Sequence, residues 1–307
     1  MPQREVFVVN AVRTAIGSFG GSLKEVALSA LATEVVRSVL ARSGVGAEHV
    51  DSVVMGNVIP TEPRDAYLSR IAAMDAGIRK EAGAFNVNRL CGSGLQAIIC
   101  AAQAIMLGDA ELAIGAGAES MSRGAYLLPS QRWGARMGNA EVLDYMMSAL
   151  HDPFQAIHMG ITAENVAARY KISRERQDQL ALQSQQRAAR AIAEGRFRSQ
   201  IVPVEIRSRK AAVMFETDEH VRMDATLESL AKLKPAFKAD GVVTAGNASG
   251  INDGASAVLL ASAAKLRELD VEPLARLVAY ASAGVEPAYM GIGPVPATRL
   301  ALERAGL

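Results

Sequence analysis

The residues best suited to chemistry surround Cys91, in the stretch AFNVNRLCGSGLQAIICAAQAIMLG. A β-rich run over 84–88 ends just before the cysteine, and an apolar helical pattern over 93–107 begins just after it. Unpaired N–H groups and the positive end of the dipole at a helix N-terminus favour a thiolate, the form that attacks a carbonyl carbon. Gly92 and Gly94 let a substrate approach the backbone closely. The pattern predicts that Cys91 is a nucleophile.

The other interpretation of a cysteine is a buried structural side chain, which is the commoner case for a free thiol. It fits Cys100, which lies nine residues further along, on the opposite side of the same predicted helix. These are the only two cysteines, and they form neither a CxxC pair nor part of a metal-ligand cluster. We therefore expect no disulfide framework and no metal site, and we expect Cys100 to be a small core side chain.

The elements that position Cys91 alternate between short β-rich runs and longer Ala-rich helical patterns, which predicts an α/β fold with a sheet flanked by helices. Gly44 and Gly108 stand where two of these helices should end. The predicted strands are 5–10, 52–58, 84–88 and 111–117, and the predicted helices are 28–43, 66–76 and 93–107.

The alternation breaks after Glu119, where the chain becomes richer in charge. Residues 120–245 contain a long polar helix pattern over 172–195, and a strand and helix return only at 255–269. Within this stretch, 165–239 has 15 Lys/Arg against 9 Asp/Glu, which suits either a solvated face or a polyanionic ligand. We predict an inserted domain over 120–245 within a domain formed by 1–119 and 246–270.

The last segment predicts a strand over 275–284, a loop over 285–297 and a helix over 298–307. Residues 5–43 have the same order of strand, polar loop and helix. The range 271–307 is therefore predicted to open a second copy of the first half, a copy that stops after its first helix.

Composition limits the classes of function. The chain has 307 residues, 50% of them hydrophobic and 5% aromatic, with a net charge of +1. Few aromatic residues and no general basic excess argue against a nucleic-acid partner. We expect no membrane span, because a span needs about 18 consecutive apolar residues. The N-terminus MPQREVFVVNAV lacks the layout of a signal peptide, which favours the cytoplasm.

Several motifs together resemble those of the thiolase family. The stretch around Cys91 resembles the nucleophile signature of that family, and GNVIPTEPRDAYLSR is similar to its short-chain β-ketothiolase subgroup. The remaining motifs are VVNAVRTAIGSFGGSLK, GAGAESMSR, HDPFQAIHMGITAEN, TDEHVRMDATLESLAKLKPAF, VTAGNASGINDGASA and MGIGPVPA. The resemblance implies a layered αβαβα fold of two similar halves, the second incomplete here, with the inserted loop domain over 120–245 forming a lid over the coenzyme A channel.

The resemblance also implies roles for individual residues. Cys91 would take the acyl group as a thioester, and its backbone N–H would help to hold the oxyanion. Without the resemblance, His158 would be interpreted as a structural histidine and Arg222 as a surface arginine. The residues implied to bind coenzyme A are Leu150, His158, Met159, Arg222, Phe237, Ala245 and Ser249.

The implied reaction is reversible thiolytic cleavage of a 3-ketoacyl-CoA, or Claisen condensation of two acyl-CoA units, in two steps of ping-pong type. Coenzyme A and acyl-CoA would be substrates rather than cofactors, and the enzyme would be a homo-oligomer, either a dimer or a tetramer. Thiolases also use a Gly-His-Pro, an Asn-Glu-Ala-Phe and a Cys-x-Gly motif, and none occurs here. The resemblance therefore predicts a C-terminally truncated thiolase whose missing strands would leave an apolar face exposed.

Three rival functions stay open at this point. A ketoacyl synthase shares the cysteine arrangement, but the long insertion with HMG and NASG argues against it. A catalytically incomplete thiolase-like module would serve as a scaffold and form no thioester on Cys91. A simple Cys–His hydrolase would use His158 as its base and would hydrolyse acyl-CoA without condensation.

Overall fold

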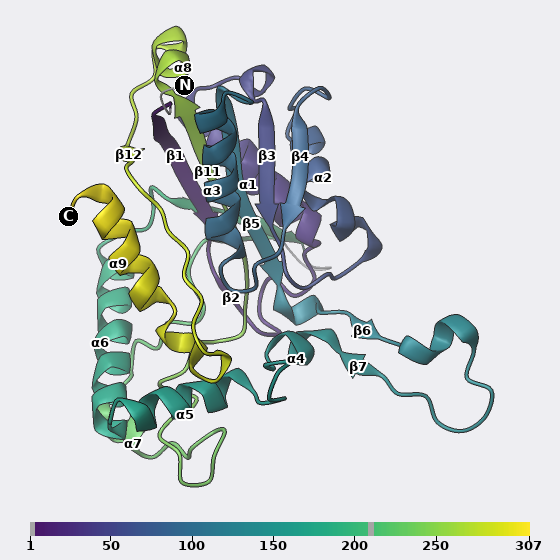
Figure 1. Cartoon of the computed structure of the whole chain (residues 1–307), viewed down its shortest axis with the longest axis vertical. Helices are drawn as coiled ribbons and strands as arrows, with labels where there is room; N and C mark the ends of the chain where they lie inside the picture. Colours follow the sequence, from purple (N-terminus) through teal and green to yellow (C-terminus); the bar gives the residue numbers. More distant parts are fainter. Residues whose placement is uncertain (1–3, 208–211) are drawn as a thin grey trace. The chain divides into compact units, whose positions relative to one another are not determined.

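The computed structural model describes residues 4–207 and 212–307 (Figure 1). The described chain forms two compact units, each assembled from three separate ranges. The first unit comprises Met1–Met146, Ser199–Glu219 and Ile251–Leu277, and the second comprises Met147–Arg198, His220–Gly250 and Val278–Leu307.

The first unit is built on a mixed sheet with strand order β12-β1-β11-β5-β3-β4. Strands β3, β4 and β5 run parallel, whereas β11 pairs antiparallel with both β1 and β5. The strands are β1 Val6–Thr14, β2 Gly17–Ser18, β3 Ser52–Gly56, β4 Gly83–Val87, β5 Leu112–Ser120, β8 Ile201–Val202, β11 Asn252–Ser262 and β12 Ala275–Leu277. Two small two-stranded sheets join β6 Tyr126–Leu127 to β7 Leu143–Asp144, and β9 Val204–Arg207 to β10 Ala212–Phe215.

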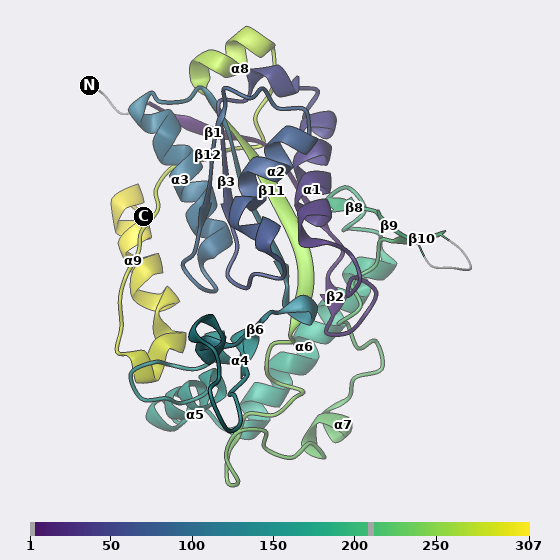
Figure 2. The same cartoon turned by 90° about the vertical axis from the view of Figure 1, so that its right-hand side faces the viewer.

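Helices cover both faces of the main sheet, with α3 on one face and α1 and α2 on the other (Figure 2). The inner face of α3 repeats small or apolar residues at helical spacing, and Ala97, Ala101 and Ile105 are fully buried. This three-layer arrangement confirms the predicted α/β class. The helices are α1 Leu28–Ser43, α2 Leu68–Asp75, α3 Ser93–Leu107, α8 Ala263–Leu269 and, at the unit boundary, α4 Tyr145–Ala149. Short 3₁₀ helices are η1 Ala47–His49, η2 Pro63–Tyr67, η3 Met121–Arg123 and η4 Pro129–Trp133.

The second unit is helical. Its longest helix, α6, begins after Ser173, whose hydroxyl accepts a hydrogen bond from the Arg176 amide at 3.3 Å. Asp178 is the buried residue of this otherwise polar helix. The elements are α5 Met159–Arg169, α6 Arg174–Ala193, α7 Leu227–Ala231, η5 Pro287–Ile292 and α9 Pro294–Ala305.

Two predictions at the end of the described chain were wrong. The strand expected over 275–284 covers only Ala275–Leu277, because Leu277 pairs with Val6, the first residue of β1. Beyond that pair the edge strand has no continuing partner in β1. The helix expected over 298–307 begins earlier, at Pro294, because a proline in the first turn of a helix already has the required φ.

One segment bears on the expectation of no membrane span, which stays a prediction. Residues Leu90–Leu107 are long and apolar enough, by length and composition alone, to cross a membrane. The packing of α3 against β3 and β5 gives a sufficient reason for this composition, because a helix pressed onto a sheet needs a broad apolar face.

The predicted domains, 1–119 with 246–270, 120–245 and 271–307, stay a prediction. They concern an internal repeat and its insertion, whereas the two compact units reflect packing, and their boundaries fall at other positions. Residues 1–3 and 208–211 of the predicted domains lie outside the described residues.

Candidate active site

Cys91 lies in a short turn between β4 and α3, as the sequence predicts, and its side chain is exposed. Gly92 is the N-cap residue of α3 and contributes no side-chain cap. The cysteine therefore stands at the positive end of a fifteen-residue helix whose dipole no capping side chain offsets. This exposed position suits a nucleophile.

A strained backbone forms the turn. Leu90 has φ of +47°, in the left-handed region that a leucine rarely adopts. The hydroxyl of Ser93 accepts from the Arg89 amide at 2.8 Å and donates to the Leu90 carbonyl at 2.6 Å. The side chain of Asn88 accepts from the Leu90 amide at 3.0 Å. Residues in such conformations persist where their surroundings hold them, and they cluster at functional sites.

Two glycines of the sheet let α3 approach the strands closely. A Cβ on Gly56, at the end of β3, would lie 2.6 Å from the carbonyl carbon of Ser93. A Cβ on Gly115, in β5, would lie 2.5 Å from the Cα of Ile98. Both distances are too short for real carbon atoms, so the position of the first turns of α3 depends on these glycines. Neither glycine was predicted to have this role, and Asn88 and Ser93 were not predicted to hold the turn.

Cys100 differs from Cys91 in its surroundings. It is partly buried and packs against the core beside Ala97 and Ala101, as predicted. The side-chain amide of Gln96 donates to its sulfur at 3.2 Å. Cys100 is therefore a structural residue and a suitable internal control for the reactivity of Cys91.

The carboxyl group of Glu119 lies at the same end of the main sheet as Cys91, where the parallel strands terminate. The parallel strands β3, β4 and β5 bring their carboxyl ends together, so Asn57 and Glu119 stand at the edge where β4 leads into the cysteine turn. Glu119 accepts from the amides of Ile59 at 2.8 Å and Val58 at 3.1 Å. Burial raises the pKa of Glu119 to about 7, although these amides act in the opposite direction. Glu119 was not predicted as a site residue, because it lies just beyond the predicted strand 111–117, although the observed β5 includes it.

In the second unit, His158 caps the N-terminus of α5. Its Nδ1 accepts a hydrogen bond from the Gly160 amide at 3.0 Å, which leaves the proton of the neutral ring on Nε2. Desolvation and the neighbouring His151 lower the pKa of His158, so the neutral form is favoured. His158 is thus a fixed donor at Nε2 rather than a permanent cation.

Phe237 stacks on the His158 ring, with centroids 4.7 Å apart and planes 20° from parallel. The stack depends on a glycine, because a Cβ on Gly160 would lie 2.2 Å from the Phe237 ring. The amide of Met159 donates to the Leu150 carbonyl at 2.8 Å, which joins two further predicted residues to the group. Four of the seven predicted coenzyme residues are thereby connected.

Ala245 and Ser249 are both exposed, on a loop whose start pairs with the segment before Phe237. The amide of Ala236 donates to the Val243 carbonyl at 2.9 Å. Arg222 is placed differently. Its side chain is exposed and its amide donates to the side chain of Gln185, on α6, at 2.8 Å.

Within 4–207 and 212–307, no group of three or more His, Cys, Asp or Glu side chains could hold a metal ion.

Comparison with known proteins gives the class of protein. The model of the thiolase N-terminal domain matches residues 6–264. Beta-ketothiolase BktB of Cupriavidus necator is 61% identical over 305 residues, which cover 99% of this chain and 77% of that protein. Among solved structures, the Bacillus anthracis acetyl-CoA acetyltransferase is 45% identical with a TM-score of 0.96, covering 99% of this chain and 77% of that one.

A human mitochondrial 3-ketoacyl-CoA thiolase, solved in complex with CoA, is 44% identical with a TM-score of 0.95. The match covers 99% of this chain and 76% of that one. The chain belongs to the thiolase family.

Proposed function

We propose that this chain is an acyl-CoA C-acyltransferase of the β-ketothiolase type, acting through an acyl thioester on Cys91. The exposed thiol at the uncapped N-terminus of α3 is the observation that carries the proposal. Membership of the thiolase family and the high identity to a β-ketothiolase support the same reaction class.

The first half-reaction moves the acyl group onto the protein. The Cys91 sulfur attacks the thioester carbonyl carbon of acyl-CoA, and the oxygen gains negative charge in the tetrahedral intermediate. The bond from that carbon to the coenzyme sulfur then breaks. The proton of the Cys91 thiol goes to the departing coenzyme A, so that acyl-enzyme and free coenzyme A result.

The second half-reaction returns the acyl group to one of two acceptors. Transfer to the thiolate of coenzyme A releases an acyl-CoA, which completes thiolytic cleavage. Transfer to the enolate of acetyl-CoA forms a carbon–carbon bond and releases 3-ketoacyl-CoA. Enolate formation needs a base for a weakly acidic proton, and we assign no described residue to that role.

The residues proposed to bind the coenzyme share an accessible position and suitable chemistry. His158 offers an Nε2 proton and an aromatic face, and Ala245 and Ser249 offer a small side chain and a hydroxyl on an exposed loop. Coenzyme A is proposed as a substrate and not as a resident cofactor. The proposed set is Leu150, His158, Met159, Arg222, Phe237, Ala245 and Ser249.

A homo-oligomer and a cytoplasmic location are further proposals. The edge strand β4 has one side without a strand partner in the main sheet, and its Phe85 side chain is exposed. A second copy of the chain could cover such an edge.

The direct test is the intact mass of the chain after incubation with acetyl-CoA, compared among wild type, Cys91→Ala and Cys100→Ala. We expect one acetyl adduct in wild type and in Cys100→Ala, and none in Cys91→Ala. Cys100→Ala is the matched control, since it removes the only other thiol. An adduct that persists in Cys91→Ala would refute the assignment, and the absence of an adduct in wild type would favour the scaffold interpretation.

A further inference from the structure

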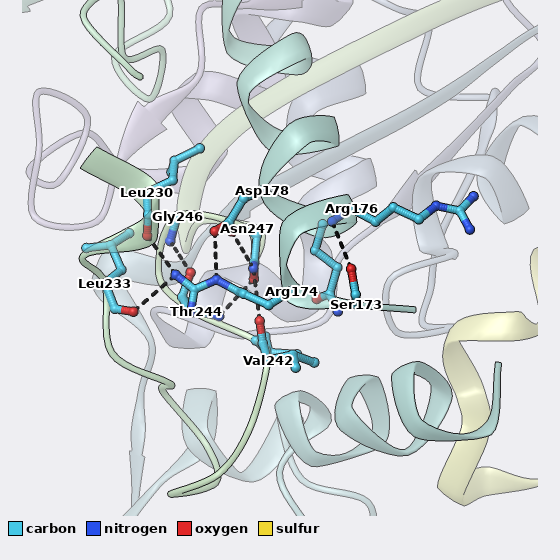
Figure 3. A network of polar contacts seen from close by, with 12 residues as sticks. Ser173, Arg174, Arg176, Asp178, Leu230, Leu233, Val242, Thr244, Gly246 and Asn247 are labelled. Carbon is cyan, nitrogen blue, oxygen red and sulfur yellow. Dashed lines mark hydrogen bonds and ion pairs between the residues drawn. The ribbon is translucent and has the colours of Figure 1, made fainter. Parts of the chain in front are cut away.

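The side chains of Arg174, Asp178 and Asn247, all in the second unit, form a polar network (Figure 3). The Arg174 Nε donates to one carboxylate oxygen of Asp178 at 2.7 Å, and the side-chain amide of Asn247 donates to the other at 2.9 Å. The Asp178 side chain is 6% exposed and that of Arg174 is 18% exposed. Both oxygens of a buried carboxylate are thus occupied by groups from different segments.

Arg174 and Asp178 lie one turn apart on α6, so they form a rigid pair on a twenty-residue helix. The pair also binds backbone. The Arg174 Nη2 donates to the carbonyls of Leu230 at 2.6 Å and Leu233 at 3.1 Å. These carbonyls stand at the end of α7, on the segment that leads to Phe237.

Asn247 binds the backbone of its own loop. Its side-chain amide donates to the Val242 carbonyl at 3.0 Å, and its side-chain oxygen accepts from the Thr244 amide at 2.8 Å. The two backbone contacts of the Asn247 side chain hold residues 242–247 in one conformation. Its third contact attaches that loop to Asp178.

A second buried carboxylate fixes the same loop to α5. Glu164 accepts from the amides of Val242 at 2.9 Å and Val243 at 2.8 Å. His158 is the N-cap residue of α5, and Phe237 stacks on its ring. These contacts therefore connect four parts of the second unit into one assembly. Its parts are α5, α6, the 230–237 segment and the 242–249 loop.

Two of the residues proposed to touch coenzyme A lie on the outer side of the 242–249 loop. Ala245 and Ser249 are exposed, while Asn247 between them points inward to Asp178. Apolar packing would bury this region without fixing the rotation of each peptide group, whereas directional hydrogen bonds fix it. A buried ion pair often adds little to the free energy of unfolding. Stability alone therefore does not explain why Arg174 also binds the Leu230 and Leu233 carbonyls.

We propose that Arg174, Asp178 and Asn247 are positioning residues for acyl-CoA, which hold the 230–237 segment and the 242–249 loop in the conformation that binds the coenzyme. The proposal rests on the proposed function, since it assumes that these two segments contact acyl-CoA. The three side chains act through the backbone and are not themselves ligands.

The test measures the rate of Cys91 acetylation against acetyl-CoA concentration, which separates half-saturation from the limiting rate. Asn247→Asp keeps the shape and the acceptor for Thr244 but places a second carboxylate beside Asp178. We expect its half-saturating concentration to rise about tenfold, with a limiting rate within about threefold of wild type. The double variant Asp178→Asn/Asn247→Asp restores a donor and an acceptor between these two side chains but leaves the Val242 carbonyl without its donor. Its half-saturating concentration should therefore lie between those of Asn247→Asp and wild type.

Asp51→Asn is the matched control. Asp51 belongs to the first unit, pairs with Arg79 and accepts from the amides of Glu111 at 2.8 Å and Leu112 at 3.1 Å. The Asp51→Asn variant therefore loses the same kind of contacts without affecting the segments proposed to bind the coenzyme. We expect its half-saturating acetyl-CoA concentration to match that of wild type. Alkylation of Cys91 by iodoacetamide should proceed at one rate in all variants, because that reagent needs no coenzyme site.

The outcomes separate the two proposals. Saturable acetylation of wild type with no change in Asn247→Asp would overturn the positioning role alone, whereas no acetylation of wild type would overturn the proposed function. If Asn247→Asp does not fold, hydrogen exchange of wild type decides. Added coenzyme A should slow exchange of the amides in 242–247, and unchanged exchange there would overturn the positioning role.

Discussion

The turn at Cys91 and the loop at Asn247 are stabilised in contrasting ways. At the cysteine, strands β3 and β5 carry Gly56 and Gly115, and the backbone of α3 packs directly against them. At the loop, charged and amide side chains fill the interior, with Asp178 nearly fully buried. The first region requires glycine, which has no side chain, at two positions of the sheet. The second requires buried polar side chains whose hydrogen-bonding groups have partners.

This difference has consequences for how each region fails. Contact between backbones allows no local adjustment, so an added methyl group must move a whole helix. A polar network tolerates small changes in volume but not the loss of one partner, because an unpaired buried charge is strongly unfavourable. Substitutions that add volume should therefore destabilise the cysteine turn more than the Asn247 loop. Substitutions that remove a charge should destabilise the Asn247 loop more than the cysteine turn.

The largest effect is expected from Gly115→Ala. Its Cβ would meet the Ile98 backbone at 2.5 Å, so we expect a loss of about 3 kcal/mol in the free energy of unfolding. Gly94→Ala is the control, since a Cβ there meets nothing within 4 Å and alanine favours a helix by about 1 kcal/mol. Urea unfolding measures both, and equal stability of the two variants would contradict the backbone-packing explanation.

The next effect is a pH dependence of the free energy of unfolding, caused by Glu119, the buried carboxyl group at the end of β5. Its pKa is raised from 4.5 to about 7 on folding, so the folded chain binds this proton more tightly than the unfolded chain does. The resulting stability is fully present below pH 4.5 and is lost as the pH rises through about 7. The full loss amounts to about 3 kcal/mol.

Glu119→Gln removes this titration while keeping the shape. Unfolding in urea at pH 5, 6, 7 and 8 should show a steeper decline in wild type than in the variant. Parallel curves for the two proteins would mean that Glu119 titrates alike in the folded and unfolded chains.

The smallest effect on stability is expected from Gly160→Ala, which brings the comparison into the second unit. Here the added Cβ meets the Phe237 ring, a side chain that can move, and alanine also favours α5. We expect a net stability change within about 1 kcal/mol. Displacement of the ring from His158 should still raise half-saturation by acetyl-CoA about threefold to tenfold. A loss as large as that of Gly115→Ala would remove the distinction between the two regions.

Much of the first unit could be predicted from local pattern. The helices Leu28–Ser43 and Ser93–Leu107 match their predicted ranges because helical periodicity ends at Gly44 and Gly108, both of which have positive φ. Strand β1 extends to Thr14, well past the predicted 5–10. Its second half, residues 10–14, mixes polar and apolar side chains and pairs with β11, and such long-range pairing leaves no local signal.

The candidate site was predictable only in part. The position of Cys91 followed from the change between β and helical patterns, whereas Gly56 and Ser93 act through contacts that the sequence does not reveal. Arg174 and Asp178 read as an ordinary surface pair on a polar helix, and only the fold brings Asn247 to them. Buried polar networks of this kind escape sequence patterns because their members look like solvated residues.

The central position of β11 has a consequence for synthesis of the chain. This strand pairs with β1 on one side and β5 on the other, yet the chain between β5 and β11, residues 121–251, is translated before it. Until Ser262 has left the ribosome, β1 and β5 both expose unpaired edges, which are prone to aggregation. The sheet that supports Cys91 can close only late, so folding of the nucleophile's scaffold waits for a strand encoded far downstream of the nucleophile itself.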